Sequence, residues 1–256
     1  MIKLSIITPV YNSKYFIETC ILNVVDQKCP YAEHIIVDGG STAGTIEIIK
    51  KYAKQYSHIR WISEKDKGQS DAMNKGIGMA KGEIINFLNA DDGYFAFTLN
   101  RVVSLFDKNP KLFFISGNCK LLDLNGNLIY INRPQRIKPY HLFSYTEPFP
   151  INPVAYFYKK VIHNNIGLYN IENRHNMDYE FILKACLNYN LIYFNEDWGY
   201  MLHHDMAITA KDTLSNQLEL RKRSVFDTIY KDCSFKIKLL AGLYKFYKLV
   251  YRKQNL

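Results

Sequence analysis

The amino-acid sequence predicts an α/β fold whose centre is a twisted, mostly parallel sheet with helices on both faces. Apolar strand patterns alternate with amphipathic helix patterns through the first part of the chain, which is typical of a parallel sheet. Polar clusters directly follow three of the predicted strands. At 256 residues, 48% of them hydrophobic, the chain is long enough for one large domain, alone or with a small appendage.

Each predicted strand is a short apolar run, and each predicted helix carries its apolar residues on one face. The predicted strands cover residues 4–8, 34–37, 59–62, 83–88, 113–117 and 191–194. The predicted helices cover residues 12–27, with Asn12 and Ser13 as its N-cap, then 45–56, 70–80, 99–106 and 178–188. The Asn-Gly pair at 125–126 predicts a tight hairpin turn, and the Pro-rich stretch 133–153 predicts a loop.

Charge and cysteine content limit the partners and the compartment. The formal net charge of +9 favours an anionic partner, such as phosphates, a nucleic acid or an acidic membrane surface. The five cysteines are far apart and form no Cys-x-x-Cys pair, which disfavours a disulfide framework or a zinc site. The N-terminal apolar run is too short for a signal peptide, and no stretch approaches transmembrane length. We therefore expect a cytoplasmic protein.

The polar clusters at residues 8–12, 38–42 and 89–92 predict a ligand site. In an open parallel sheet, ligands bind at the carboxyl ends of the strands, and each cluster stands at such an end. Any one of them could be a helix cap instead. Three in succession at the same edge favour ligand binding.

The third cluster contains two adjacent acids, Asp91 and Asp92, directly after an apolar strand. One or two carboxylates are enough to hold Mg²⁺ or Mn²⁺ against a diphosphate, so this turn is a candidate metal site. The alternative is that the pair caps the helix near Leu99. Helix capping is a stronger alternative to metal binding for Asp92 than for Asp91.

Three runs of sequence together resemble family 2 glycosyltransferases with the GT-A fold, of the bacterial surface-polysaccharide type. The runs are LSIITPVYN from Leu4, HIIVDGGSTAGT from His34 and SEKDKGQSDAMNKGIGMAKGEIINFLNADD from Ser63. The resemblance implies a GT-A catalytic domain at 1–212, with a nucleotide-sugar half at 1–120 and an acceptor half at 121–212. Residues 213–256 are then a basic, amphipathic helical extension.

The resemblance also implies roles for individual residues. The implied nucleotide-binding residues are Pro9, Tyr11, Asp38, Lys67, Gly68, Asp71, Asn74 and Ala90, with Asp38 accepting a hydrogen bond from the base. The family's Asp-x-Asp metal motif falls on residues 89–91, so Asp91 is implied to hold the metal. The chain departs from the family at Asn89, where a carboxylate is usual, and at Ala43, where Asp is usual.

An inverting transfer needs a carboxylate that takes the proton of the acceptor hydroxyl. Asp178 matches the family's base in the run from Asn176 to Phe181, and Glu180 is the second choice. The alternative is that Asp178 is only an N-cap. His204 is a candidate contact for the metal or the phosphates, against the ordinary alternative of a surface or core histidine.

The tail from Ser234 contains no acid, and four cations recur at helical spacing: Lys238, Lys245, Lys248 and Arg252. A basic amphipathic helix with aromatic residues fits an anionic membrane surface, where the acceptor would be a lipid-linked sugar. A helix packed on the protein's own core is the equally weighted alternative.

We therefore expect inverting transfer of a hexose or N-acetylhexosamine from a nucleotide sugar, with UDP favoured, to a saccharide acceptor in surface-polysaccharide synthesis. Capsule, exopolysaccharide and lipopolysaccharide are the expected products, made at the inner face of the cell membrane. A nucleotidyltransferase or a dehydrogenase would need a glycine-rich loop after the first strand, which residues 8–15 lack. The remaining alternatives are a decayed GT-A scaffold and a polyanion-binding module; we expect no nucleic-acid partner, because the cations are scattered outside the tail.

Overall fold

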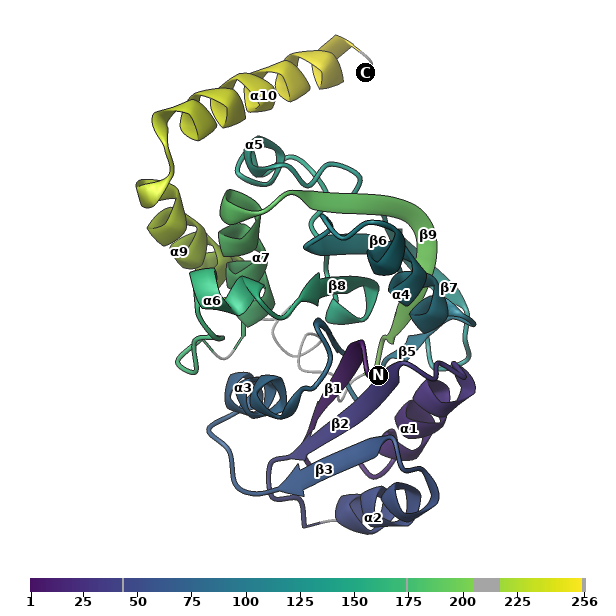
Figure 1. Ribbon diagram of the computed structural model, residues 1–256. Helices are drawn as coiled ribbons and strands as arrows, with labels where there is room; N and C mark the ends of the chain where they lie inside the picture. Colours follow the sequence, from purple (N-terminus) through teal and green to yellow (C-terminus); the bar gives the residue numbers. More distant parts are fainter. Residues whose placement is uncertain (43, 174, 205–216, 255–256) are drawn as a thin grey trace.

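The computed structural model describes residues 1–42, 44–173, 175–204 and 217–254 (Figure 1). Its strands are β1 Leu4–Val10, β2 Ala32–Asp38, β3 Ile59–Ser63, β4 Ile84–Phe87, β5 Gly93–Tyr94, β6 Phe114–Leu122, β7 Leu128–Asn132, β8 Tyr156–Lys159 and β9 Leu191–Leu202. Within the described residues they form one sheet in the order β3-β2-β1-β4-β8-β6-β9-β5, with β7 paired to β6. The predicted hairpin is confirmed, because β6 and β7 are antiparallel on either side of Gly126.

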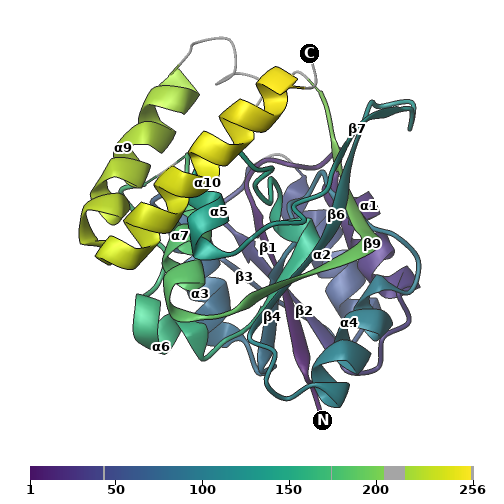
Figure 2. The same cartoon turned by 90° about the horizontal axis from the view of Figure 1, so that it is seen from above.

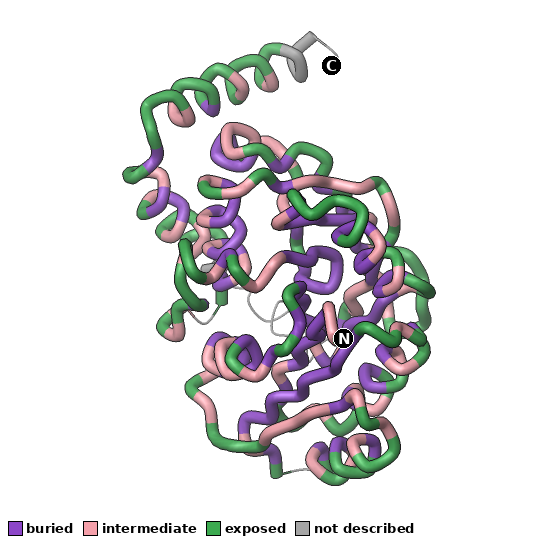
Figure 3. Tube along the Cα trace, viewed as in Figure 1, coloured by how far each residue is buried: buried purple, intermediate pink, exposed green. Residues whose placement is uncertain are grey.

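The helices cover both faces of the sheet, as predicted. They are α1 Ile17–Asp26, α2 Thr45–Gln55, α3 Gln69–Met79, α4 Thr98–Lys108, α5 Pro139–Leu142, α6 Ile162–Ile166, α7 Met177–Asn188, α9 Gln217–Asp232 and α10 Phe235–Gln254, with a 3-10 turn, η1, at Pro153–Ala155. In β2, Ile35 and Val37 pack toward α3, whereas Ile36 packs toward α1 and α2. All three are fully buried, since a parallel strand between two helical layers has no solvent face (Figure 3).

The first half of the sheet is parallel and the second half is mixed. Strands β3, β2, β1 and β4 are parallel neighbours. Strand β8 lies between β4 and β6 and is antiparallel to both, with Tyr158 paired to Ile85 on one side and to Phe114 on the other. The antiparallel part is therefore larger than predicted. Strand β8 was missed because its four residues follow a Pro-rich loop and carry no alternating pattern.

Several predicted boundaries are corrected. Helix α1 begins at Ile17 and not at Asn12, because Asn12 has a left-handed φ of 51°. Strand β9 runs to Leu202 rather than ending at Phe194. The predicted division into two halves stays a prediction; residue 120 lies inside β6, which pairs with strands of the second half in the same sheet. The predicted boundary at 212/213 lies outside the described residues, as does Ala43.

Helix α9 packs on α7 and helix α10 packs on α5, and both helices lie over this part of the molecule (Figure 2). Helix α10 turns a narrow stripe inward, made by Ile237, Ala241, Tyr244 and Lys248 at helical spacing. The predicted packing on the protein's own body is thus limited to this stripe. Large apolar side chains are exposed on the rest of α10: Phe235, Leu239, Leu240, Leu243, Phe246, Tyr247, Leu249 and Val250. Among the described residues, no helix combines the length and the apolar character that a membrane crossing requires.

Candidate active site

The turns after β1 and β2 are joined to each other at the carboxyl edge of the sheet. The Asn12 backbone N–H donates to Ser41 Oγ at 2.7 Å, and the Thr42 N–H donates to Asn12 Oδ1 at 2.9 Å. Asn12 is therefore a link between two loops and not a helix cap. Nearby, Pro9 is half-buried at the end of β1 and Tyr11 is 62% exposed. An exposed aromatic ring above a strand end is free to contact a base.

Asp38 at the end of β2 is fully buried, and its own turn occupies its carboxylate. The Gly40 and Ser41 N–H groups donate to Oδ2 at 3.1 and 3.0 Å, and Ser63 Oγ donates to the same oxygen at 2.6 Å. The Ser41 hydroxyl donates to Oδ1. Asp38 thus holds the turn and the end of β3 together, and its contact with a base stays a prediction.

A second carboxylate at this edge, Asp66, was missed by the sequence reasoning although it lies within the third quoted run. A Cβ added to Gly39 would lie 2.4 Å from Asp66 Oδ2, so only glycine lets this carboxylate approach the turn after β2. Asp66 Oδ1 accepts the Gly68 N–H at 2.9 Å. Asp66 is half-buried beside Gly39, so this edge carries an accessible acid in addition to the buried Asp38.

The residues predicted to border the ribose and diphosphate have different surroundings. Lys67 is exposed, and its N–H donates to Asp71 Oδ2 at 3.0 Å, so Asp71 fixes the loop that starts α3. Gly68 has a φ of 118° that favours glycine. Asn74 Nδ2 donates to the Tyr169 carbonyl at 2.8 Å, and Asn74 Oδ1 accepts the Tyr169 N–H at 2.9 Å. This pairing supports a positioning role for Asn74 rather than a nucleotide contact.

The acidic turn after β4 is held by amide side chains. Asn89 accepts from Gln69 Nε2 at 3.0 Å and donates to Asp92 Oδ2 at 2.8 Å. Asn152 donates to the same Asp92 oxygen at 2.8 Å. Asn89 therefore fills a place where a second carboxylate would face the buried Asp92. Ala90, also in this turn, is buried.

Asp92 itself is almost completely buried, and burial followed by the nearby Asp91 charge raises its pKa well above the ordinary value. The two amide bonds oppose that rise. Helix α4 begins with no side-chain cap, so the predicted capping alternative near Leu99 is wrong. The surroundings of Asp92 also speak against its predicted metal role, because its Oδ2 is already bound by two amides.

Asp91 and His204 come together from distant parts of the chain. His204 Nε2 lies 3.0 Å from Asp91 Oδ2, and its ring stacks on Phe16 with centroids 4.7 Å apart. His204 Nδ1 has no hydrogen-bond partner among the described residues. Mn²⁺ and Mg²⁺ sites that hold a nucleotide often use one or two protein ligands and take the rest from phosphates and water. An adjacent carboxylate and imidazole fit this scheme, although the described residues contain no group of three or more candidate ligands.

Asp178 lies at the second position of α7, whose cap is Asn176, so the predicted capping alternative for Asp178 is wrong. Tyr156 Oη donates to Asp178 Oδ1 at 2.7 Å. Burial raises the pKa of Asp178 to about 6, against the lowering effect of that hydrogen bond. Glu180, the second choice, has both oxygens occupied by Asn173 and Lys184 at 2.8 and 2.6 Å. The geometry favours Asp178 as the available base.

Two connections link the surroundings of Asp178 to the segments around the acidic turn. Ser70 at the start of α3 donates to the Asn173 carbonyl at 3.2 Å, next to the loop that leads into α7. The segment 152–156 touches both carboxylates, because Asn152 binds Asp92 and Tyr156 binds Asp178. No sequence pattern singled out Asn152 or Tyr156, since Asn152 ends a Pro-rich loop and Tyr156 begins β8, whose strand pairing only the fold defines.

The comparisons with known proteins show the family and the fold of the chain. Residues 5–165 match the family model described as Glycosyl transferase family 2. A PGL/p-HBAD biosynthesis glycosyltransferase of Mycobacterium bovis is 30% identical over 193 residues, covering 73% of this chain and 71% of the relative. The uncharacterized glycosyltransferase YibD of Escherichia coli is 40% identical over 90 residues, 35% of this chain and 26% of the relative. The chain thus matches about a quarter of that relative's length.

Solved structures confirm the GT-A fold. Staphylococcus aureus TarS 1–349 in complex with UDP-GlcNAc has a TM-score of 0.66 at 21% identity, covering 80% of this chain and 60% of that one. The mannosyltransferase PcManGT from Pyrobaculum calidifontis, in complex with GDP-Man and Mn²⁺, has a TM-score of 0.61 at 16% identity and covers 98% and 82%. The family match spans more than half of the chain. The protein belongs to glycosyl transferase family 2.

Proposed function

We propose that the protein transfers a hexose or N-acetylhexosamine from a nucleotide-diphosphate sugar, in the first instance a UDP-sugar, to a saccharide acceptor with inversion. The observation that carries this proposal is the segment 152–156, which binds Asp92 at one end and Asp178 at the other. The acidic turn and the base are thereby held on either side of one short segment. Direct displacement needs this arrangement, since donor and acceptor hydroxyl must be positioned together.

The donor would bind across the turns after β1, β2 and β4, with its base near Pro9, Tyr11 and the Asp38 turn. Asp91 and His204 would hold a divalent metal, Mn²⁺ or Mg²⁺. A bound metal would neutralise charge on the diphosphate leaving group. The support for this assignment is their 3.0 Å approach at the carboxyl edge of the sheet.

Asp178 would take the proton of the attacking hydroxyl as its oxygen bonds to the anomeric carbon and the bond to the diphosphate oxygen breaks. A pKa of about 6 leaves this carboxylate ionised at neutral pH yet basic enough to accept a proton. Tyr156 fixes one carboxylate oxygen and leaves the other for the acceptor. The aromatic stretch 140–158 would shape the acceptor side.

The acceptor is proposed to be a lipid-linked saccharide of a surface polysaccharide, reached at the inner face of the membrane. The exposed apolar side chains of α10, with Lys236 and Lys245 exposed among them, support docking to anionic lipid. Lys248 does not belong to that surface, because it pairs with Glu147 at 2.8 Å. In a flotation assay with phosphatidylglycerol vesicles, the wild type should float with the vesicles and the Leu243→Glu variant should not. Equal amounts of both proteins in the vesicle fraction would show that α10 is not the docking element.

Calorimetric titration with UDP, GDP and dTDP, with and without Mn²⁺, tests the donor site. We expect one nucleotide to bind in a metal-dependent way and Asp91→Ala to abolish that dependence, because the variant lacks the carboxylate that would hold the metal. Asp107→Ala is the matched control, since Asp107 is an exposed acid paired with Lys3. Binding of no nucleotide would overturn the proposal and favour a decayed scaffold or a polyanion-binding module.

A further inference from the structure

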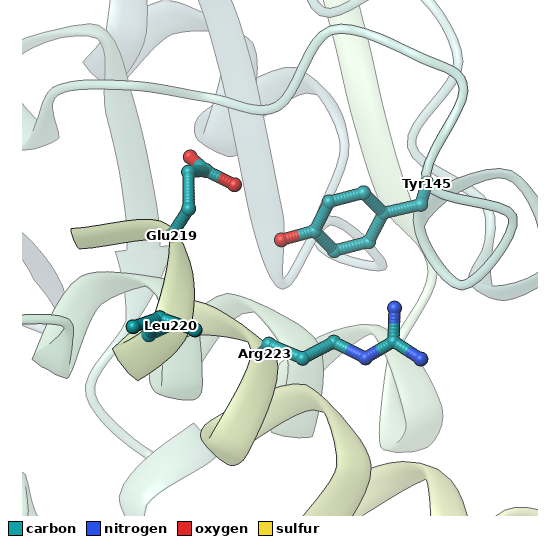
Figure 4. A pocket seen from close by; sticks show the side chains of 4 residues that line it. All are labelled: Tyr145, Glu219, Leu220 and Arg223. Atoms are coloured by element: carbon teal, nitrogen blue, oxygen red, sulfur yellow. The ribbon is translucent and has the colours of Figure 1, made fainter. Parts of the chain in front are cut away.

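A cavity of about 500 Å³ lies between the loop after α5 and the first turns of α9 (Figure 4). It is lined by Tyr145, Glu219, Leu220 and Arg223. Its volume lies within the range of small-ligand sites, about 300–1,000 Å³. The proposed donor site and its metal use none of these residues, so among the described residues the cavity is separate from that site.

Tyr145 is held in an unfavourable backbone conformation at the edge of this cavity. Its φ is +61°, in the left-handed region, where a bulky side chain costs about 1–2 kcal/mol. The buried Ser144 fixes the turn, because its hydroxyl donates to the His141 carbonyl at 2.6 Å and accepts the Thr146 N–H at 3.3 Å. The surrounding turn thus holds an aromatic ring out toward the cavity, and such retained strain is frequent at binding sites.

The Tyr145 ring is fixed but remains open to a ligand. Its edge-to-face contact with Phe226 of α9 has centroids 5.3 Å apart, and its hydroxyl lies near that of Tyr179. The side chain is still 45% exposed. Tyr179 directly follows Asp178 in α7, so the Tyr145 ring packs near the same end of α7 that carries the proposed base. A rigid, half-open aromatic face can stack on the apolar face of a sugar ring.

The charges around the cavity balance. Glu219 pairs with Lys222 at 3.3 Å, and Arg223 pairs with Asp227 at 3.2 Å. A phosphate or a uronate would require an excess of positive charge, and the described residues that line the cavity contribute one acid and one base. Carboxylate acceptors and guanidinium donors instead match the hydroxyl groups of a neutral sugar. Figure 4 shows the Tyr145 hydroxyl pointing across the cavity toward the side of Glu219 and Leu220.

From these contacts we propose that the cavity binds a neutral pyranose unit of the acceptor saccharide, next to the unit that carries the reacting hydroxyl. Tyr145 stacks on the ring, and Glu219 and Arg223 bind its hydroxyls. The inference rests on the proposed function, because it assigns this sugar to the acceptor of Asp178. It makes Tyr145 a specificity-determining residue for chain length in the acceptor.

Saturation-transfer NMR on the full chain tests the proposal, with methyl β-lactoside, maltose and methyl β-chitobioside as neutral probes and a glucuronic-acid disaccharide as the charged one. We expect at least one neutral probe to bind and Tyr145→Gly to weaken it about tenfold, since an aromatic contact is worth up to about 1.5 kcal/mol. Tyr145→Gly removes the ring but suits the left-handed backbone, so a loss of binding would report the ring and not added strain. Tyr145→Phe should retain stacking, and Tyr130→Ala, which removes another exposed tyrosine, is the matched control.

Three results would overturn the proposal: no neutral probe binds, the glucuronic-acid probe binds in preference, or Tyr145→Gly leaves binding unchanged. Asp178→Asn separates this site from the reacting position, because it should leave probe binding at Tyr145 intact. UDP titration of the same samples keeps the two proposals apart. A protein that binds UDP but no neutral sugar would overturn the cavity assignment alone, whereas a protein that binds sugar but no nucleotide would overturn the proposed function.

Discussion

The turn after β2 and the start of α7 each present an aspartate, and the two are surrounded very differently. Asp38 accepts four hydrogen bonds from its own chain, two of them from backbone N–H groups. Asp178 accepts one described side-chain hydrogen bond, from Tyr156. Burial raises the pKa of Asp178 to about 6. Both carboxylates lie among buried groups, but only the first has donors enough to stabilise its charge.

This contrast separates a carboxylate that supports the fold from one that is available for proton transfer. Donors that saturate a carboxylate make it a poor base and a strong structural link. A carboxylate with few donors is a better base but does not stabilise the fold when ionised. Substitution should therefore damage activity at Asp178 and stability at Asp38.

The largest expected effect is on catalysis at Asp178. Asp178→Asn should lower kcat about 10²–10⁴-fold, because no base remains to take the hydroxyl proton. Folding raises the pKa of this carboxyl from 3.8 to about 6. The carboxyl therefore stabilises the fold at a pH below 3.8, and this contribution is lost as the pH rises through about 6. At pH 7 the variant should consequently unfold no more easily than the wild type. Steady-state rates and thermal denaturation check both parts; normal rates would remove Asp178 as the base.

The next effect is on stability at Asp38. Asp38→Asn should lower the free energy of unfolding by about 3 kcal/mol, since an amide presents an NH₂ group to a site lined by donors. Denaturant unfolding measures the loss, and Asp107→Asn at the surface should change it by less than about 0.5 kcal/mol. Equal stabilities of the Asp38 and Asp107 variants would show that the saturated turn is not a structural link.

Asn89 offers a test within the acidic turn itself. Asn89→Asp restores the acid that is usual in the family, but it replaces the donor that faces Asp92 at 2.8 Å with a like charge. We expect a loss of about 2 kcal/mol in unfolding free energy and no gain in Mn²⁺ affinity. Denaturant unfolding and Mn²⁺ titration measure the two quantities. Tighter Mn²⁺ binding in a stable variant would instead mean that position 89 faces the metal.

The smallest effect sharpens the description of Asp178. Tyr156→Phe removes the hydrogen bond that lowers the pKa of this carboxyl, so the pKa should rise above 6. The acidic limb of the kcat/KM profile should move to higher pH, with a few-fold loss at pH 6 and little change at pH 8. A uniform loss at every pH would point to general structural damage instead. Tyr130→Phe is the matched surface control.

Much of the first half of the fold follows from local pattern. Strands β1 to β4 and helices α2 and α3 lie close to their predicted positions, because each short apolar run is buried between two helical layers. The helix predicted from Asn12 failed for a local reason, since Asn12 instead joins two loops. Strand β8 was not predicted, for a non-local reason: only its pairing with β4 and β6 makes it a strand.

The same distinction between local pattern and non-local contacts applies to the candidate site. The acids that directly follow strands, Asp38 and Asp91, could be located from sequence because a strand end fixes its neighbours. Their surroundings could not, since Asp38 takes a donor from β3 and Asp91 meets His204 from 113 residues away. Asn152 lies in the Pro-rich loop and Tyr156 begins β8, and no sequence pattern singles out either residue as a partner of the two acids.

The anchoring of the tail is a further case that sequence pattern could not resolve. Glu147 pairs with Lys248 and accepts from Tyr244 Oη at 2.6 Å. Burial alone would raise the pKa of Glu147, but these partners lower it on balance. Lys248, one of the cations predicted to face a membrane, therefore anchors α10 to the loop after α5 instead.

The sequence by itself determined the α/β class, the family and the edge of the sheet at which ligands bind, because strand ends and motif order are local properties of the chain. The tertiary structure decided which acids are saturated and which remain available. It also decided how closely His204 approaches Asp91 and which face of α10 is buried. Those properties depend on donors that arrive from remote segments, and a carboxylate's chemistry is set by the donors around it rather than by its place in the sequence.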